Sequence, residues 1–245
     1  MRFTYLGLLI LGLTSCSGSK MLQKNLSKFQ APIGYLHDSK IVDSPKNDTI
    51  FISAINNKGI DSITTVTKIN SKILPFLLFN YTETNMKVEL GQSSIEQSYN
   101  DFFTNSLIDE SKRSANFVID PRSAGKNQYS LEINIDTCNV RSKYQRSTTV
   151  LFFFVAYSMS FQELGFPSET NLVVTAKLKK EGQIISEKSY RVKRTQPFLN
   201  SQSIKLQSDF TANMVESLSL STKQCIEDLI KDLNNSQLKS NKTIS

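Results

Sequence analysis

The sequence has one histidine, His37, and no tryptophan among its 245 residues. A single histidine argues against serine or cysteine hydrolysis, because the nucleophile normally needs a positioned base that is usually histidine. It makes a histidine-based zinc site equally implausible. The lack of tryptophan weakens glycan binding, since only tyrosine and phenylalanine remain to stack on sugars. The nine glycines are scattered and form no glycine-rich phosphate loop.

Long apolar runs are also lacking, because no internal stretch reaches the roughly 18 residues of a membrane-spanning helix. The 39% apolar and 21% charged composition excludes disorder throughout, and the length allows one domain with appendages. The net charge of +7 is modest. The densest basic regions, residues 177–180 and 191–194, carry no aromatic-interleaved nucleic-acid motif, so we expect no nucleic-acid partner. Solvated strand faces explain these lysines better than a lipid-binding patch does.

The amino terminus has the layout of an export signal. A positive start at Arg2 precedes the apolar run 6–13, and Leu13-Thr14-Ser15-Cys16 follows. These four residues resemble the bacterial lipobox. The resemblance implies that residues 1–15 are a signal peptide and that Cys16 carries a diacylglycerol and an amide-linked acyl chain such as palmitate. Several acyl chains are enough for stable anchoring, so we expect a membrane partner through the acylated amino terminus. The alternatives are an ordinary export signal and a fortuitous apolar start.

Residues 17–20 suggest which membrane holds the anchor. They lack the aspartate that resembles an inner-membrane retention signal, and they lack an acidic run of the kind that looks like a surface-export signal. We therefore expect an outer-membrane lipoprotein that faces the periplasm, with the inner membrane and surface exposure as alternatives. The periplasm is oxidising and permits disulfides.

Composition divides the remaining chain into three parts. Residues 16–60 are rich in Asn, Lys, Ser and Asp, and we expect a polar tether with one short strand at 49–55. Residues 61–235 carry strong patterns and are predicted to form a single domain. Residues 236–245 return to a polar tail without apolar period.

Apolar periodicity within residues 61–235 predicts the elements. Alternation predicts strands at 73–81, 86–90, 117–119 and 131–135, and a hairpin over 172–192 that turns at Glu181-Gly182. Helical spacing predicts a helix after the capping box 93–96, and a long closing helix from Ser208 or Asp209 onwards.

This order, β-α-β-β-β-α, predicts an α+β two-layer sandwich, with a mostly antiparallel sheet and both amphipathic helices on one face. In element order alone it resembles small envelope lipoprotein domains of the PqiC-type transport auxiliary, YajG-like, and LpoB or TolB amino-terminal kinds. That resemblance implies a noncatalytic role in binding or positioning another envelope component, and fold analogy alone does not establish a mechanism.

The segment 150–161 is uniformly apolar and phenylalanine-rich, and it is too short to cross a membrane. By the usual behaviour of apolar runs it is a core strand or a hairpin packed on its own domain. The functional alternative is a hairpin that docks on a membrane or a partner, aided by the basic residues at 141, 143 and 146. The docking candidates are Phe152, Phe153, Phe154, Tyr157 and Phe161.

Acylation of Cys16 would leave Cys138 and Cys225 as an even pair. We weigh a disulfide between them evenly against two separately buried thiols. Cys138 is out of phase with the preceding apolar residues, and a bulge near Asp136 or Thr137 would bring it to the buried face.

The carboxylate pairs Asp109-Glu110 and Glu227-Asp228 are the remaining catalytic candidates, but adjacent helix positions point to different faces. We therefore expect no catalytic residues, no metal and no cofactor. The favoured function is a lipid-anchored accessory or scaffolding subunit of an envelope transport or assembly system, with an envelope protein or lipid as partner. An envelope-polymer hydrolase that uses carboxylates alone and a surface adhesin are the alternatives.

Overall fold

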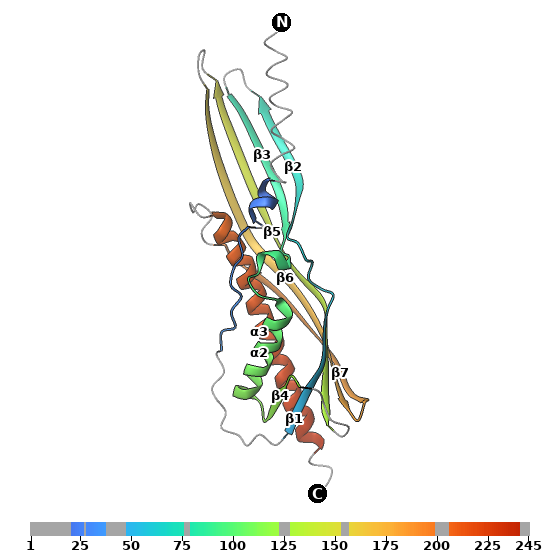
Figure 1. Ribbon diagram of the computed structural model, residues 1–245. Coiled ribbons are helices and arrows are strands. Elements are labelled where there is room, and N and C mark those ends of the chain that lie inside the picture. Colours follow the sequence, from blue (N-terminus) through green and yellow to red (C-terminus); the bar gives the residue numbers. More distant parts are fainter. Residues whose placement is uncertain are drawn as a thin grey trace.

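The protein is an α+β sandwich. A computed structural model describes residues 21–26, 28–37, 48–75, 79–122, 128–152, 157–198 and 206–240. Within them lie seven strands of one sheet, a 3-10 turn and two long helices (Figure 1). The strands are β1 (Asp48–Asn57), β2 (Thr65–Pro75), β3 (Phe79–Glu89), β4 (Phe117–Asp120), β5 (Tyr129–Phe152), β6 (Tyr157–Lys180) and β7 (Gln183–Gln196). The predicted fold class is confirmed.

The sheet is mostly antiparallel and is organised around β5. Its order is β2-β3-β5-β1-β4, and β6 pairs with β5 along its whole length, on the edge opposite to β3 and β1, and also with β7. Only the pairings of β1 with β4 and with β5 are parallel. β5 and β6 each run for 24 residues and form one hairpin. The expected short strand at 49–55 is therefore β1, and it lies inside the sheet.

Two helices, α2 (Tyr99–Ser114) and α3 (Leu206–Ser240), cover one face of the sheet (Figure 1). The predicted apolar stripe of α3 is buried, at Phe210, Met214, Leu218, Cys225, Leu229 and Leu233. The helix continues to Ser240, into the first residues of the predicted polar tail.

The start of α2 differs from the predicted capping box. Residues 92–94 form the 3-10 turn η1 (Gln92–Ser94), and the helix begins later, after Ser98. The side-chain oxygen of Gln92 accepts the backbone N–H of Tyr99 at 3.0 Å, which satisfies one of the free donors of the first helical turn. From Tyr99 onwards the expected apolar residues of the helix face inward.

Part of the predicted tether packs against the domain. Residues 21–26 are helical, and Leu22 and Leu26 are buried. Ala31 pairs with Ile95 in a short parallel bridge, and the carbonyl oxygen of Gly34 accepts the Ser219 hydroxyl of α3. We call residues 28–37 the strap. The polar composition concealed a few well-spaced apolar side chains that are enough to bury this segment, so the folded domain starts well before residue 61.

The proposed bulge before Cys138 is present. The register between β5 and β6 shifts between Ile135 and Thr137, and Cys138 and Val140 are both buried. The hairpin of β6 and β7 turns at Glu181 and Gly182, which both have positive φ, as a type I′ turn requires. Its predicted inward residues on β6, from Leu172 to Leu178, are buried as expected.

The predicted strand over 73–81 is wrong. Ile73 and Pro75 belong to the end of β2, and Phe79 and Tyr81 to the start of β3, which pairs with β2 in antiparallel fashion. Leu77 lies outside the described residues. Ile73 and Pro75, expected on a buried face, are exposed. Residues 73–79 are apolar at every position and not only at every second one. A continuous apolar run of this kind does not specify a period of two, so it does not predict a single strand.

Candidate functional site

The least ordinary surface of the molecule is a four-stranded part of the sheet that the helices do not cover. It starts from one row of paired residues, Lys68, Met86, Tyr144 and Gly165. Beyond that base row lie residues 69–75, 79–85, 145–152 and 157–164, which we call the extension. It consists of the ends of two hairpins, β2–β3 and β5–β6, and it points away from α2 and α3 (Figure 1).

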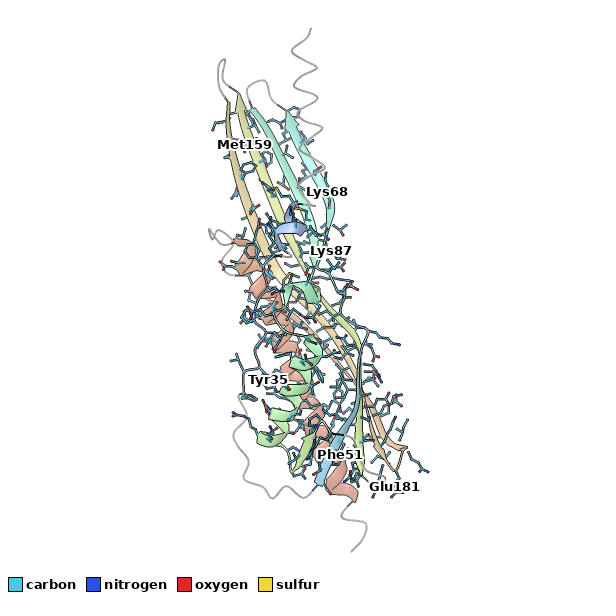
Figure 2. The ribbon with its side chains drawn as sticks, viewed as in Figure 1. Tyr35, Phe51, Lys68, Lys87, Met159 and Glu181 are labelled. Carbon is cyan, nitrogen blue, oxygen red and sulfur yellow. The ribbon has the colours of Figure 1, made fainter. Side chains whose placement is uncertain are left out.

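The side chains change their environment sharply at the base row. Met86 and Tyr144 are buried, whereas among the described side chains of the extension only Ser147 is buried. Met159 is 44% exposed and Phe161 is 55% exposed. Figure 2 shows Met159 near the outer end of the extension and Glu181 at the opposite end of the molecule. The extension is therefore a sheet without a core.

Apolar side chains lie on both faces of the extension. Strand pairing places Ile73, Val150, Met159 and Phe161 on the face that continues the core, and Leu74 and Leu151 on the other face. Five of them are exposed: Ile73, Leu74, Leu151, Met159 and Phe161. Ile69 at the bulge of β2 is exposed as well. Clusters of this kind are typical of interaction surfaces rather than of a free monomer surface.

The extension also has two open edges. The outer edge of β2 has no partner strand among the described residues, and β7 pairs with β6 only from Ser168 onwards. The outer edge of β6 over residues 157–167 is therefore unpaired in the described part of the chain. Open backbone edges next to exposed apolar side chains invite contact with another surface.

A polar cluster joins the base of the extension to α3. The Tyr144 hydroxyl donates to Glu163 Oε2 at 2.6 Å, and Gln207 at the start of α3 donates to the same oxygen at 3.2 Å. The Arg146 guanidinium lies 4.9 Å from the Phe161 ring centroid. Burial, and then the neighbouring Glu163 carboxylate, raises the pKa of Tyr144 well above its usual value. This cluster holds the extension at a defined orientation relative to the helix.

The predicted docking residues fall on this surface as far as they are described. Phe161 is on β6 and is exposed, so the expectation that the segment is core is wrong for this residue. Phe152 and Tyr157 pair with each other across the hairpin, and their side chains lie outside the description. Phe153 and Phe154 lie outside the described residues, as does the predicted lipid attachment site Cys16.

The β2–β3 half of the extension was missed at the sequence level. The signal was present, because residues 73–79 read Ile-Leu-Pro-Phe-Leu-Leu-Phe without a polar residue. This is the same anomaly as in residues 150–161. Two such apolar runs, one in each of two adjacent hairpins, would have indicated that both hairpins contribute to one apolar end of the sheet.

Cys138 and Cys225 are free thiols and are both buried. Burial raises the pKa of each to about 12, so both are neutral at ordinary pH. Tyr99 lies near both thiols, and its hydroxyl is 2.8 Å from Thr222 Oγ1. The two residues thus act as small apolar groups of the core in this structure.

The structure gives His37 a partner that the sequence did not suggest. His37 Nδ1 lies 3.3 Å from Oε2 of Glu110, whose side chain is only 1% exposed. Asp109 next to it pairs with Lys112 at 3.2 Å on the exposed side of the helix. The two neighbouring carboxylates thus face different surroundings, as their adjacent helix positions require.

A cavity lies near the end of α3, between the helix and β6–β7. It has a volume of about 330 Å³ and is lined among others by Lys188, Tyr190 and Asp232. Lys188 Nζ donates a hydrogen bond to Asp232 Oδ2, so the two charges in the cavity pair with each other. Burial, and then the Asp232 carboxylate, raises the pKa of Tyr190. The cavity offers no group of three or more metal-binding side chains, and none is found elsewhere in the described ranges.

Comparisons with known proteins identify no family. No protein-family model matches the chain, and no curated protein matches it. Among solved structures it is similar to the crystal structure of protein XCC0632 from Xanthomonas campestris, of family DUF330, at 12% identity. The match covers 86% of this chain and 98% of that chain with a TM-score of 0.46. A likeness this distant carries no functional argument.

Neither long helix of the described residues is apolar enough over its length to cross a membrane.

Proposed function

We propose that this protein is a lipid-anchored, noncatalytic lipoprotein of the bacterial envelope, which binds another envelope component as an accessory or scaffolding subunit of a transport or assembly system. The observation that carries the proposal is the extension, a bare sheet with exposed apolar side chains on both faces. Exposing these apolar side chains to water is unfavourable, and contact with another surface would remove that cost. The lipobox-like sequence 13–16 supplies the anchor and the export route.

The positions of the carboxylates support binding over hydrolysis. A carboxylate-only glycosidase needs two acids that face each other about 5 to 10 Å apart in a cleft. Glu110 instead faces His37 in the interior, whereas Asp109 lies on the exposed side with Lys112. Glu227 lies 4.0 Å from Lys223, one turn back on its own helix. None of these contacts joins two acids.

The anchor is tested on protein purified from a bacterial host membrane. We expect mass spectrometry of the amino-terminal peptide to show a chain that begins at Cys16 and carries acyl groups. Cys16→Ala should keep its signal peptide and lose the acyl groups, and Cys225→Ala should remain acylated, as the matched control. An unmodified Cys16 in the wild-type chain would refute the anchor.

Binding is tested by crosslinking in the envelope. A photoreactive residue in place of Phe161 should give crosslinks to an envelope component, and the same residue in place of Ile185 is the control. Ile185 is similarly exposed, at 52%, but lies on β7 near the opposite end of the molecule. Equal crosslinking from both positions would contradict a specific role for the extension.

A further inference from the structure

Three features of the chain locate the extension relative to a lipid anchor. The first is the segment 21–26, which packs where the β2–β3 hairpin leaves the domain. The Leu26 carbonyl oxygen lies 3.5 Å from Ser94 Oγ, and Ser94 Oγ lies 2.7 Å from Thr64 Oγ1, one residue before β2. From there the strap runs away from the extension, past Ser219 on α3 to Glu110 on α2. The chain before residue 21 therefore starts at the base of the extension.

The second feature is the shortness of the link. Cys16 is five residues before Met21, and five fully extended residues span at most about 18 Å. The extension projects from Tyr144 to Leu151, which is about 24 Å of strand. The opposite end, at Lys180, lies 15 residues along β6 from Gly165, which is about 50 Å away. An acylated Cys16 therefore brings the bilayer to the extension and cannot bring it to the other end.

The third feature is the chemistry of the end that this geometry turns toward the lipid. Six large apolar side chains of the extension are exposed: Ile69, Ile73, Leu74, Leu151, Met159 and Phe161. The far end exposes two, Ile184 and Ile185, beside the polar turn Glu181-Gly182. Exposed apolar side chains are thus concentrated at the end that lies near the proposed anchor.

We propose that the outer end of the extension enters the interface of the lipid bilayer that holds the acylated Cys16. The ends of the β2–β3 and β5–β6 hairpins then contact the bilayer, and the rest of the domain projects away from it. This inference rests on the proposed lipid anchor. Aromatic and aliphatic side chains gain free energy when they leave water for the boundary between headgroups and acyl chains. An exposed cation lies on the extension itself, Lys72 on β2. It forms no ion pair with another described residue, so it is available to anionic headgroups.

The absence of tryptophan makes a direct test simple, because one introduced tryptophan is the only such fluorophore. The full acylated chain carrying Phe161→Trp is reconstituted into vesicles of phosphatidylethanolamine and phosphatidylglycerol. The matched control is Ile185→Trp, with similar exposure at the opposite end. A second probe, Met159→Trp, covers the case in which Phe161→Trp fails to fold. A fraction of the lipid carries brominated acyl chains, which quench only a tryptophan that reaches them.

We expect a blue-shifted emission and strong quenching by brominated lipid for Trp substitutions at 161 and 159, and neither effect at 185. Quenching at 161 no stronger than at 185 would overturn the docking. A blue shift without quenching would also overturn it, because a second copy of the chain or a protein partner would then cover the extension. Mass spectrometry of the same sample separates the two proposals: an acylated Cys16 with an unquenched tryptophan refutes only the docking, and an unmodified Cys16 refutes the anchor.

Discussion

Gly165 occupies the place where the extension leaves the domain, and its replacement by alanine tests how tightly this base is packed. Gly165 pairs with Tyr144 on the face that α3 covers. A methyl group built there would lie 2.5 Å from Cε1 of Phe198 and 2.9 Å from Cδ2 of Phe210. Both distances are shorter than carbon atoms tolerate, so the two rings must move. They stack edge to face on each other, with centroids 5.9 Å apart, so neither moves alone.

The expected cost follows from the size of this overlap. Overpacking a close-packed core costs about 1–3 kcal/mol, and a free-energy loss of 1 kcal/mol lowers Tm by about 2–4 °C in a domain of this size. Gly165→Ala should therefore lower Tm by about 2–12 °C. At an unhindered site the same change would stabilise by about 0.4–1 kcal/mol, because it restricts the unfolded chain. A decrease in Tm thus indicates a tightly packed base, and an increase indicates an unhindered one.

Two further variants isolate the cause. Gly34→Ala is the control, because its added methyl group would meet no atom within 4 Å, and its free energy of unfolding should rise by about 0.4–1 kcal/mol. Adding Phe198→Leu to Gly165→Ala should recover part of the loss, since it removes the ring atoms closest to the new methyl group. Denaturant unfolding followed by circular dichroism measures all of these variants. A Gly165→Ala protein as stable as the wild type would refute the packing at this base.

Three other outcomes follow from the structure. Cys138 and Cys225 have a folded-state pKa of about 12, against an ordinary value of 9.0. Above pH 9 the unfolded chain loses these protons first, so the free energy of unfolding should fall by up to about 1.4 kcal/mol per pH unit per thiol. Denaturation of the wild type and of the double alanine variant between pH 9 and 10 checks this. His37→Ala should lower the free energy of unfolding by about 1–2 kcal/mol, because the buried Glu110 loses a partner; an unchanged urea midpoint would contradict the contact. Phe161→Ser should cost only about 1 kcal/mol, since half of the ring is already in water, and a loss above about 3 kcal/mol in the same assay would mean that the ring is core.

The parts of the fold that the sequence predicted well are those with a clean local period. The stripe of α3 from Phe210 to Leu233 and the alternation of β6 from Leu172 to Leu178 each repeat over several turns or residue pairs. A period of this length specifies both the type of element and its buried face. The bulge before Cys138 was predictable for the same reason, because a buried residue out of phase requires one.

The errors arose where burial depends on distant partners. The strap is polar on average, and its packing depends on single contacts such as Gly34 with Ser219 on α3. The neighbours of β1 in the sheet, β4 and β5, are far away in the sequence, so its parallel place inside the sheet had no local signal. His37 and Glu110 are 73 residues apart in the sequence, so their contact had no local signal either.

The sequence by itself determined the elements with a clean period, the α+β class and the lipobox-like motif that predicts the anchor, because each depends on neighbouring residues. It also marked residues 150–161 as abnormal, but an apolar run looks the same whether it is covered or bare. Only the tertiary structure decided whether this run is buried, because burial depends on how far the helices extend along the sheet. α3 begins at the base of the extension and α2 lies further from it, so no helix covers Leu151, Met159 and Phe161 and their side chains are exposed.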